Sequence, residues 1–110
     1  MDLLTAKYEK DGDILKITLS GEIDHHSAKA VREDIDRQLY YYRAKTVLLD
    51  LAAVTFMDSS GLGLLLGRYT HVHELGGELK VLDPSEGVER MLRVVGAERL
   101  MPIVRSEDKK

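Results

Sequence analysis

The chain has 110 residues, a formal net charge of −3 at pH 7 and no cysteine. Its 44% hydrophobic and 32% charged residues are typical of a globular protein, and the length suffices for one hydrophobic core. The composition excludes disulfides, thiolate metal sites and cysteine nucleophiles, and the acidic balance argues against sequence-independent binding of nucleic acid. We therefore expect a single domain over residues 1–110.

Membrane insertion and export are also not indicated. No apolar run approaches the roughly 20 residues that a membrane-spanning helix requires. The N-terminal residues Met1–Leu4 lack the basic start and the long apolar core of a signal peptide. Together with the lack of cysteine, these features favour a cytoplasmic protein.

The first part of the chain predicts a β-hairpin followed by a helix. Leu3–Glu9 and the apolar run Ile14–Leu19 are separated by a turn that contains Asp11-Gly12, a pattern typical of antiparallel strands. Asp24 is a plausible N-cap for the helix that follows. The apolar positions of this helix recur every three or four residues, at Ala28, Val31, Ile35, Leu39 and Tyr42.

The stretch Thr46–Tyr69 predicts a buried strand that is joined to a helix by a polar corner. Val47–Leu51 has the length and aliphatic content of the strand, and Asp58 and Ser59 are both good N-cap residues. Such a corner lies at the carboxyl end of a strand, where α/β sheets place their functional groups. The apolar face of the helix is expected at Leu62, Leu65, Leu66, Tyr69, Val72 and Leu75.

The last part of the chain predicts another strand, another helix and a short final strand. Gly76-Gly77 ends the central helix, and Leu79–Leu82 should pair in parallel with the Val47–Leu51 strand. A helix then starts at Asp83-Pro84-Ser85, and Ile103-Val104 forms the last strand. We predict an α/β fold with a small mixed sheet, antiparallel at its N-terminal edge, packed with about four α-helices. The apolar face of the last helix is expected at Val88, Met91, Leu92 and Val95.

The corner after Met57 carries glycines that no common motif explains. Gly61 and Gly63 cost roughly 1 kcal/mol each against alanine in a helix. They leave backbone amides bare and let another surface approach, although they also suit a tight turn. The spacing to Gly67 is one residue too long for a dinucleotide fingerprint, and the segment has neither a P-loop pattern nor the G-x-S-x-G of hydrolases around Ser59.

Other candidates for chemistry are weaker. His25-His26 and His71-x-His73 point in different directions on a helix, so neither pair makes a ready metal site. Tyr40–Tyr42 could stack a base, but one packed ring and two surface rings fit the pattern better. Asp24 and Asp58 could form an acid–base pair at one edge of the sheet. So small a domain offers little cleft, and solvated helix caps are the simpler interpretation.

Two motifs resemble those of one known family. The sequence F-M-D-S-S-G-L-G at Phe56–Gly63, followed by L-G-R-Y at Leu66–Tyr69, resembles the signature of the sulfate-transporter and anti-sigma-factor-antagonist (STAS) domain. The segment Leu19–His26 resembles the strand-to-helix corner of the sporulation-type anti-sigma factor antagonists within that family. With Gly76-Gly77-Glu78, the resemblance covers most of the chain.

This resemblance implies a binding protein that phosphorylation switches. In the family, the serine after the aspartate, here Ser59, is phosphorylated by an anti-sigma factor that is a serine kinase, and a serine phosphatase reverses the step. The unphosphorylated form binds the anti-sigma factor and frees the sigma factor. The resemblance implies no enzymatic activity, cofactor or metal, and no direct contact with nucleic acid or membrane. The implied partner-binding residues are Asp24, Asp58, Ser60, Gly61, Leu62 and Gly63.

A phosphate on Ser59 is expected to leave the fold intact. It would add about −1.5 to −2 charges at neutral pH. It would meet bare amides at the positive end of a helix dipole, a contact worth typically 0.3–1 kcal/mol. In a closely fitted interface the same charge would be costly to bury, so we expect binding to be blocked by local charge.

One departure from the family and two other functions stay open. Family members commonly carry a longer C-terminal helix, whereas only Arg105–Lys110 follow the last apolar pair. An alternative function is a small-ligand or nucleotide-sensing domain that uses the amides of Ser60–Gly63 as an anion site. A hydrolase with Ser59 as its nucleophile has little support, since no histidine is placed to serve it.

Overall fold

A mixed five-stranded sheet in the order β1-β2-β3-β4-β5 forms the centre of the molecule, as seen in a computed structural model that describes residues 3–106. Residues 1, 2 and 107–110, which the single-domain prediction also covered, lie outside the described residues. The elements are β1 (Thr5–Asp11), β2 (Ile14–Ile23), α1 (His25–Tyr42), β3 (Thr46–Met57), α2 (Ser59–Glu74), β4 (Glu78–Leu82), α3 (Glu86–Val94), the 3₁₀ helix η1 (Ala97–Arg99) and β5 (Ile103–Val104).

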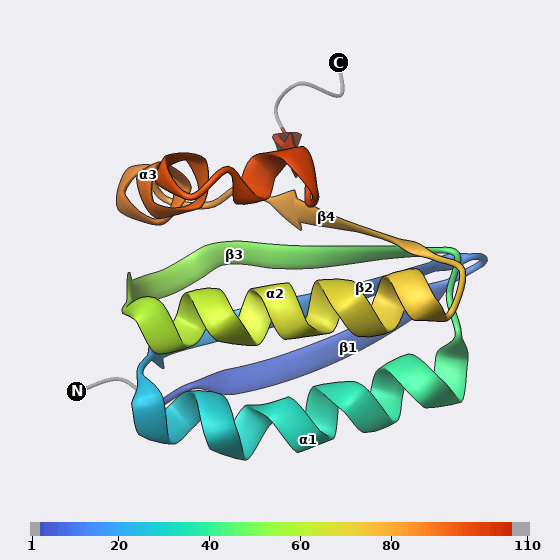
Figure 1. Ribbon diagram of the computed structural model, residues 1–110. Coiled ribbons are helices and arrows are strands. Elements are labelled where there is room, and N and C mark those ends of the chain that lie inside the picture. The colour runs from blue at the N-terminus through green and yellow to red at the C-terminus, as the bar shows by residue number, and fades with distance from the viewer. Residues whose placement is uncertain (1–2, 107–110) are drawn as a thin grey trace.

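The strand directions confirm the predicted α/β class. β1 is antiparallel to β2, and the other neighbouring pairs are parallel. The expected number of helices was too high, because residues 3–106 form three α-helices and the fourth helical segment, η1, is a single 3₁₀ turn. α1 and α2 run side by side across one face of the sheet, and α3 lies beside β4 at the opposite edge from β1 (Figure 1). Among the helices of residues 3–106, none combines the length and apolarity needed to cross a bilayer.

The core lies between the sheet and the helices that cover it. Along β2, side chains alternate between buried and partly exposed, as expected for a strand with one covered face. The side chains with almost no exposed surface come from β2, β3, β4, α2, α3 and the segment after η1: Leu15, Ile17, Leu19, Leu49, Leu51, Val81, Leu65, Leu92 and Met101.

Some predicted helix faces differ from the observed ones. Val95 is exposed because α3 ends one residue earlier, and Met101, beyond η1, is buried in the core. Tyr42, in the last turn of α1, is also exposed. On α2, Leu64 is buried whereas Leu62 is only partly buried, because α1 and the sheet together cover a different arc of the helix than the spacing suggested.

β3 is longer than the apolar run Val47–Leu51 predicted. The prediction ended this strand at Leu51, but it continues to Met57. Its register with β2 shifts after Asp50 and again after Val54, so beyond Leu51 the buried positions recur every third residue. The amide of Ala52, next to the first shift, donates to Asp50 Oδ1 at 3.0 Å. The added length carries β3 past its last pair with β4 and positions the corner that follows.

A largely buried ion pair joins α1 to α2. The Arg68 side chain is 5% exposed, and its Nε lies 2.8 Å from Asp36 Oδ1. Neither of these two atoms has a hydrogen bond of good geometry within the described chain, so the contact is mainly electrostatic. Burial lowers the pKa of Arg68, and the charge of Asp36 opposes that shift. On the other side of α1, the Tyr8 hydroxyl of β1 donates to Asp34 Oδ2 at 2.6 Å.

The C-terminal end is fixed without a long final helix. The predicted strand at Ile103-Val104 is confirmed and pairs in parallel with β4. Arg105 donates to the Pro84 carbonyl at 2.8 Å and contacts the Glu89 carboxylate, which ties the segment after β5 to the start of α3. Together with β5, these contacts hold this edge of the sheet to the start of α3.

Candidate functional site

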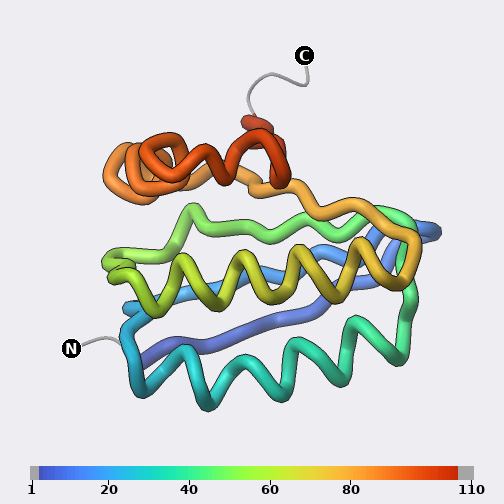
Figure 2. The backbone as a smooth tube through the Cα atoms, in the orientation of Figure 1, coloured from blue at the N-terminus to red at the C-terminus, as the bar shows by residue number. Residues whose placement is uncertain are grey.

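The carboxyl ends of β2 and β3 bring the two polar corners together. Ile23 pairs with Met57, and the Asp58 amide donates to the Ile23 carbonyl at 3.2 Å. Asp24 and Asp58 therefore follow neighbouring positions on adjacent parallel strands. Both corners lie at the same end of the molecule (Figure 2).

Asp24 is the N-cap of α1, as the sequence predicts. Its Oδ1 accepts hydrogen bonds from the amides of His26 at 3.0 Å and Ser27 at 2.9 Å. The Ser27 hydroxyl accepts in return from the Asp24 amide at 2.9 Å, which completes a capping box. These bonds, led by that from the Ser27 amide, lower the pKa of Asp24. The carboxylate is thus charged at neutral pH and engaged as a cap.

Asp58 caps α2 and occupies the helix N-terminus. Its Oδ1 accepts from the amides of Ser60 at 2.8 Å and Gly61 at 3.3 Å, and its carbonyl accepts from the Leu62 amide at 3.3 Å. The expectation of bare amides in this turn is therefore wrong for these residues. An anion bound at the amides of Ser60–Gly63 would compete with the Asp58 carboxylate, which counts against the ligand-sensing alternative in that form.

Ser59 is the first residue of α2 and is exposed at its tip. The next residue, Ser60, is partly buried and lies on the side of α2 that faces α1. This difference follows from the turn of about 100° between successive helical residues. Of the two serines, Ser59 is the more accessible to a modifying enzyme.

The two glycines of the first turn have different environments. A Cβ on Gly61 would overlap Met57 Cγ and lie 3.0 Å from Ile23 Cγ2, so glycine is needed there for the helix to pack on the strand ends. Gly61 is buried and supports the corner from inside. A Cβ on Gly63 would meet no atom within 4 Å, and Gly63 is exposed. Packing explains Gly61 and leaves Gly63 as open surface.

Two grooves flank the N-terminal half of α2. The apolar groove, of about 410 Å³, lies between α2 and α3 and is lined by Leu62, Gly87, Arg90, Met91, Val94 and Val95. The basic groove, of about 510 Å³, lies between α1 and α2 and is lined by His25, Ala28, Lys29, Arg32, Ser60, Gly63, Leu64, Gly67 and Arg68. The implied partner-binding residues are therefore divided: Leu62 belongs to the apolar groove, and Ser60 and Gly63 belong to the basic one.

Sequence reasoning missed most of the residues that line these grooves. Val94, in the apolar groove, is 78% exposed although it is a large apolar side chain. One signal was available, because Val94 and Val95 are consecutive and cannot both lie on one helix face. No signal in the sequence pointed to Lys29 and Arg32, since isolated basic residues on a helix are usually solvated.

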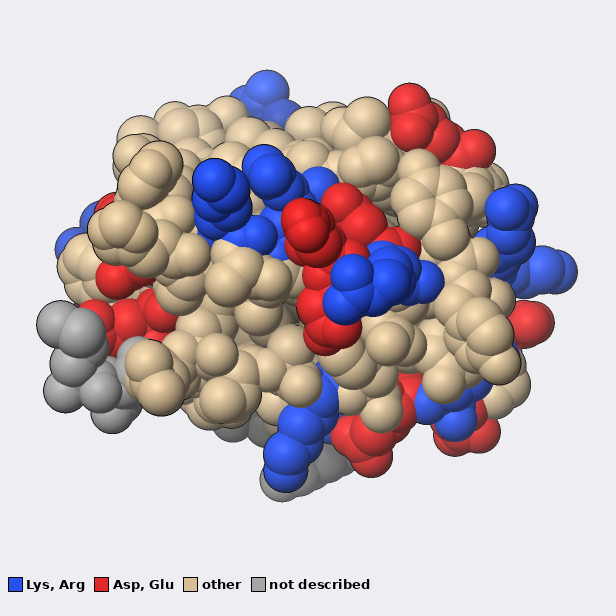
Figure 3. Space-filling model, turned by 90° about the horizontal axis from the view of Figure 1, so that it is seen from below, with Lys and Arg blue, Asp and Glu red and all other residues tan. Residues whose placement is uncertain are grey.

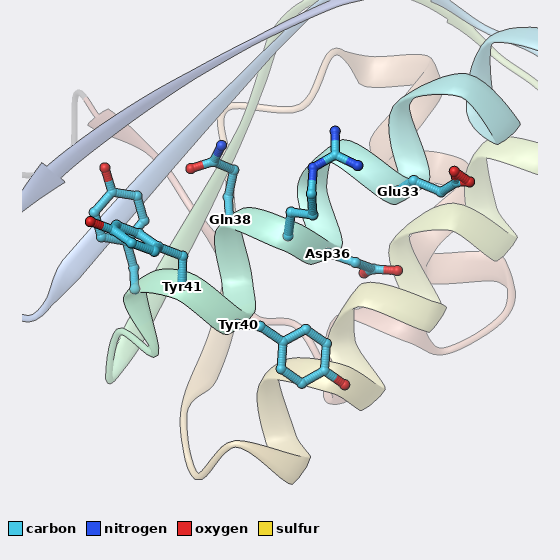
Figure 4. A pocket seen from close by; sticks show the side chains of 7 residues that line it. Glu33, Asp36, Gln38, Tyr40 and Tyr41 are labelled. Carbon is cyan, nitrogen blue, oxygen red and sulfur yellow. The ribbon is translucent and has the colours of Figure 1, made fainter.

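A third hollow lies at the C-terminal end of α1 (Figure 4). Tyr40, Tyr41 and Tyr42 are all exposed there, so the expectation that one of these rings packs inside is wrong. The rings of Tyr41 and Tyr42 meet edge to face with centroids 4.9 Å apart, and the Tyr40 hydroxyl lies 3.1 Å from Nδ1 of His71. Tyr40 and Tyr41 point in different directions from the helix (Figure 4), so they do not converge on one ligand.

Fold and site together define a small α/β domain whose candidate functional residues lie at a strand-to-helix corner on the surface. The chain belongs to the STAS-domain family, whose sequence profile matches residues 5–110. The resemblance seen in the sequence motifs is thereby confirmed.

Relatives of known role share this fold over nearly the whole chain. The chain is 38% identical over 104 residues to the anti-sigma F factor antagonist of Paenibacillus polymyxa, covering 94% of this chain and 89% of that protein. The unphosphorylated form of the anti-sigma factor antagonist SpoIIAA is 28% identical with a TM-score of 0.78, covering 94% of this chain and 91% of that one. The phosphorylated form of SpoIIAA, a Bacillus cell fate determinant, is 28% identical with a TM-score of 0.73, covering 94% and 95%.

Proposed function

We propose that this protein is an anti-sigma factor antagonist whose binding is switched by phosphorylation of Ser59. The unphosphorylated form binds an anti-sigma factor that is also a serine kinase, and this binding frees the sigma factor. The kinase inactivates the antagonist by phosphorylating Ser59, and a serine phosphatase restores it. The relatives named above support the antagonist role. The observation that carries the switch is the exposed serine at the tip of α2, between two open grooves.

The apolar groove is the surface that best fits a protein partner. Val94 and Val95 are exposed and Leu62 and Met91 are half-buried, so together they form an apolar patch next to the serine. Partly exposed apolar anchors around a small pocket are the kind of residue on which interfaces depend. We assign the anti-sigma factor to this groove. Asp24, Asp58, Ser60 and Gly63 then form the polar border of the same interface.

A binding role also accounts for the two carboxylates. Asp24 and Asp58 are the residues best placed for acid–base chemistry, and both are engaged as helix caps. The amides that donate to Asp24 lower its pKa, so this carboxylate is poorly suited to exchange protons at neutral pH. Their arrangement therefore supports a surface for recognition rather than an active site.

The phosphate blocks binding by its charge. It would add about −1.5 to −2 charges beside Asp58, whose Oδ1 already holds the nearby amides of α2. In a fitted interface, removing this charge from water costs several kcal/mol unless a cation pairs with it. Each 1.4 kcal/mol lowers the affinity tenfold. No change of fold is required, and the similarity to both forms of SpoIIAA agrees with that.

The site of modification can be tested directly. Incubation with the cognate kinase and ATP, followed by fragmentation mass spectrometry, should place one phosphate on Ser59. Ser59→Ala should abolish incorporation and keep the complex intact in the presence of ATP, whereas the matched variant Ser60→Ala should still be phosphorylated and released. Phosphate on Ser60 or Thr55 in the parent protein would overturn the assignment.

A further inference from the structure

The basic groove has a charge opposite to that of the whole chain. The protein has a net charge of −3, yet the residues that line this groove include Lys29, Arg32 and Arg68 and no carboxylate. Of these three cations, Arg68 is paired with Asp36. Within residues 3–106, Lys29 and Arg32 form no ion pair. Seen from below, basic side chains gather beside acidic ones over the α1 side of the molecule (Figure 3).

Arg68 is a fixed, buried part of this groove, and Asp36 balances its charge. Its guanidinium is held by burial and by Asp36, and its Nη1 donates to the Leu64 carbonyl at 3.4 Å. Burial lowers the pKa of Arg68, and the charge of Arg32 adds to that effect. The two guanidinium groups are thus close enough to repel each other. Like charges that converge in a hollow favour the binding of an anion between them.

The other wall of the groove is kept open by glycine. Gly63 and Gly67 are one helical turn apart and lie on the same side of α2. A Cβ on either residue would meet no atom within 4 Å, so packing does not require glycine at these positions. Glycine is otherwise disfavoured inside a helix. Space for a ligand against the helix backbone explains both residues.

We propose that the basic groove between α1 and α2 binds the phosphate group of a small molecule, which Lys29 and Arg32 hold against Gly63 and Gly67. An arginine guanidinium matches the geometry of phosphate oxygens, and lysine adds a mobile charge. Ser60, at the end of the groove nearest the corner, supplies a hydroxyl donor. The volume of about 510 Å³ leaves room for a pyrophosphate or for the organic part of a phosphate ester. This site is distinct from the apolar groove and from the amides that Asp58 holds.

The test is a titration of the isolated protein with pyrophosphate, followed by amide NMR. In the parent protein, the amides of Gly63 and Gly67 should shift saturably. The double variant Lys29→Gln/Arg32→Gln should bind at least tenfold more weakly. The matched double variant Lys7→Gln/Arg99→Gln removes the same charge from exposed positions outside the groove and should bind as the parent does. Equal affinity of the two double variants, or no saturable shift in the parent, would overturn the proposal.

A second variant tests the role of the open wall without altering charge. Gly63→Ala should weaken pyrophosphate binding because the methyl group enters the groove, while its melting temperature should rise because alanine favours the helix. Affinity equal to that of the parent would refute this role of Gly63. Inorganic phosphate and ribose 5-phosphate, titrated in parallel, distinguish a free oxyanion from a phosphate ester by which of them binds more tightly. Since no kinase is present, the result is independent of the switch at Ser59.

Discussion

Single residues at the β2–α1 and β3–α2 corners show where helix chemistry alone was enough to predict the helix caps. Asp24 and Asp58 were predicted as caps because their side chains suit that position, and both accept backbone amides. The prediction did not anticipate that the Asp58 cap would occupy the Ser60 and Gly61 amides and so leave them unavailable to a ligand. A sequence gives two good cap residues at Asp58 and Ser59, and only the structure shows that Asp58 takes the role and leaves Ser59 exposed.

Gly61 and Gly63 should respond to alanine with opposite signs. Gly61→Ala forces a methyl group onto Met57 and Ile23, and such overpacking costs typically about 1–3 kcal/mol of the free energy of unfolding. Gly63→Ala has free space and should raise that free energy by up to about 1 kcal/mol. Urea denaturation of both variants against the parent measures the two values. Equal effects of the same sign would show that the corner packs differently.

The cap at Asp24 should make stability depend on acid. The pKa of Asp24 in the folded protein lies below its ordinary value of 3.8, so its contribution is complete above that value and is lost as the pH falls through the folded pKa. Asp24→Ala should melt below the parent at pH 7, and this gap should narrow below pH 3.8. Thermal melts across this range provide the measurement. A gap that stays constant with pH would mean that the charge of Asp24 does not contribute.

Among whole elements, β3 shows the limit of reading periodicity. The apolar run that predicted a strand over Val47–Leu51 ends where the register with β2 first shifts. Beyond that point a buried residue recurs every third position, a pattern that no regular strand has. The helices were easier to predict, because spacings of three and four identify a face. The part of that face that is buried depends on neighbours that lie far apart in the sequence.

The packing of α1 against α2 should depend on the balance of one ion pair. Asp36→Asn leaves the Arg68 guanidinium buried without a counter-charge, and we expect a loss of about 3 kcal/mol of the free energy of unfolding. Arg68→Met replaces the cation with an apolar side chain of similar length and should cost much less. Chemical denaturation of both variants tests this difference. If Arg68→Met were the more damaging change, the pair would contribute more by attraction than it costs by burial.

The apolar groove between α2 and α3 should contribute to binding more than to folding. Leu62→Ala should weaken the complex with the anti-sigma factor by about 1–2 kcal/mol. It should lower the free energy of unfolding by less than the 2–5 kcal/mol that is usual for a fully buried leucine. Leu66→Ala is the matched control, because Leu66 is also half-buried on α2 but lies outside this groove.

Titration calorimetry with parallel melts separates the two effects. Comparable losses of affinity in Leu62→Ala and Leu66→Ala would place the docking surface elsewhere. An intact affinity in Leu62→Ala, with a large loss of stability, would make Leu62 a core residue.

For the molecule as a whole, the sequence predicted the layers but not the surfaces. Its order of strands and helices, its antiparallel first pair and its polar corners all follow from local patterns. The grooves are formed by the packing of α1, α2 and α3 beside one another. The sequence around Arg32 or Val94 does not indicate that these residues line a groove. The expectation that Ser59 is the phosphorylated residue came from the family motif, because periodicity carries no information about modification.

The folded molecule should tolerate the modification that switches it. Phospho-Ser59 protein, or Ser59→Asp, should melt within a few degrees of the parent, since about 1 kcal/mol shifts a domain of this size by roughly 4–8 °C. Binding to the anti-sigma factor should fall at least tenfold. Calorimetric melts and a binding titration of the same samples test both statements. Unfolding on phosphorylation would show that the switch acts through stability instead.

The hydrogen bonds of Asp58 also affect how long a phosphate on Ser59 would persist. Because that carboxylate already holds the Ser60 and Gly61 amides, the protein has few donors left there with which to enclose the new group. A phosphate enclosed by its own protein would be shielded from hydrolysis, and removing it would first require local opening. At the exposed tip of α2, the ester stays open to an attacking nucleophile. The lifetime of the phosphate on Ser59 would then be set by the activity of the phosphatase. The fold of the antagonist would not prolong it.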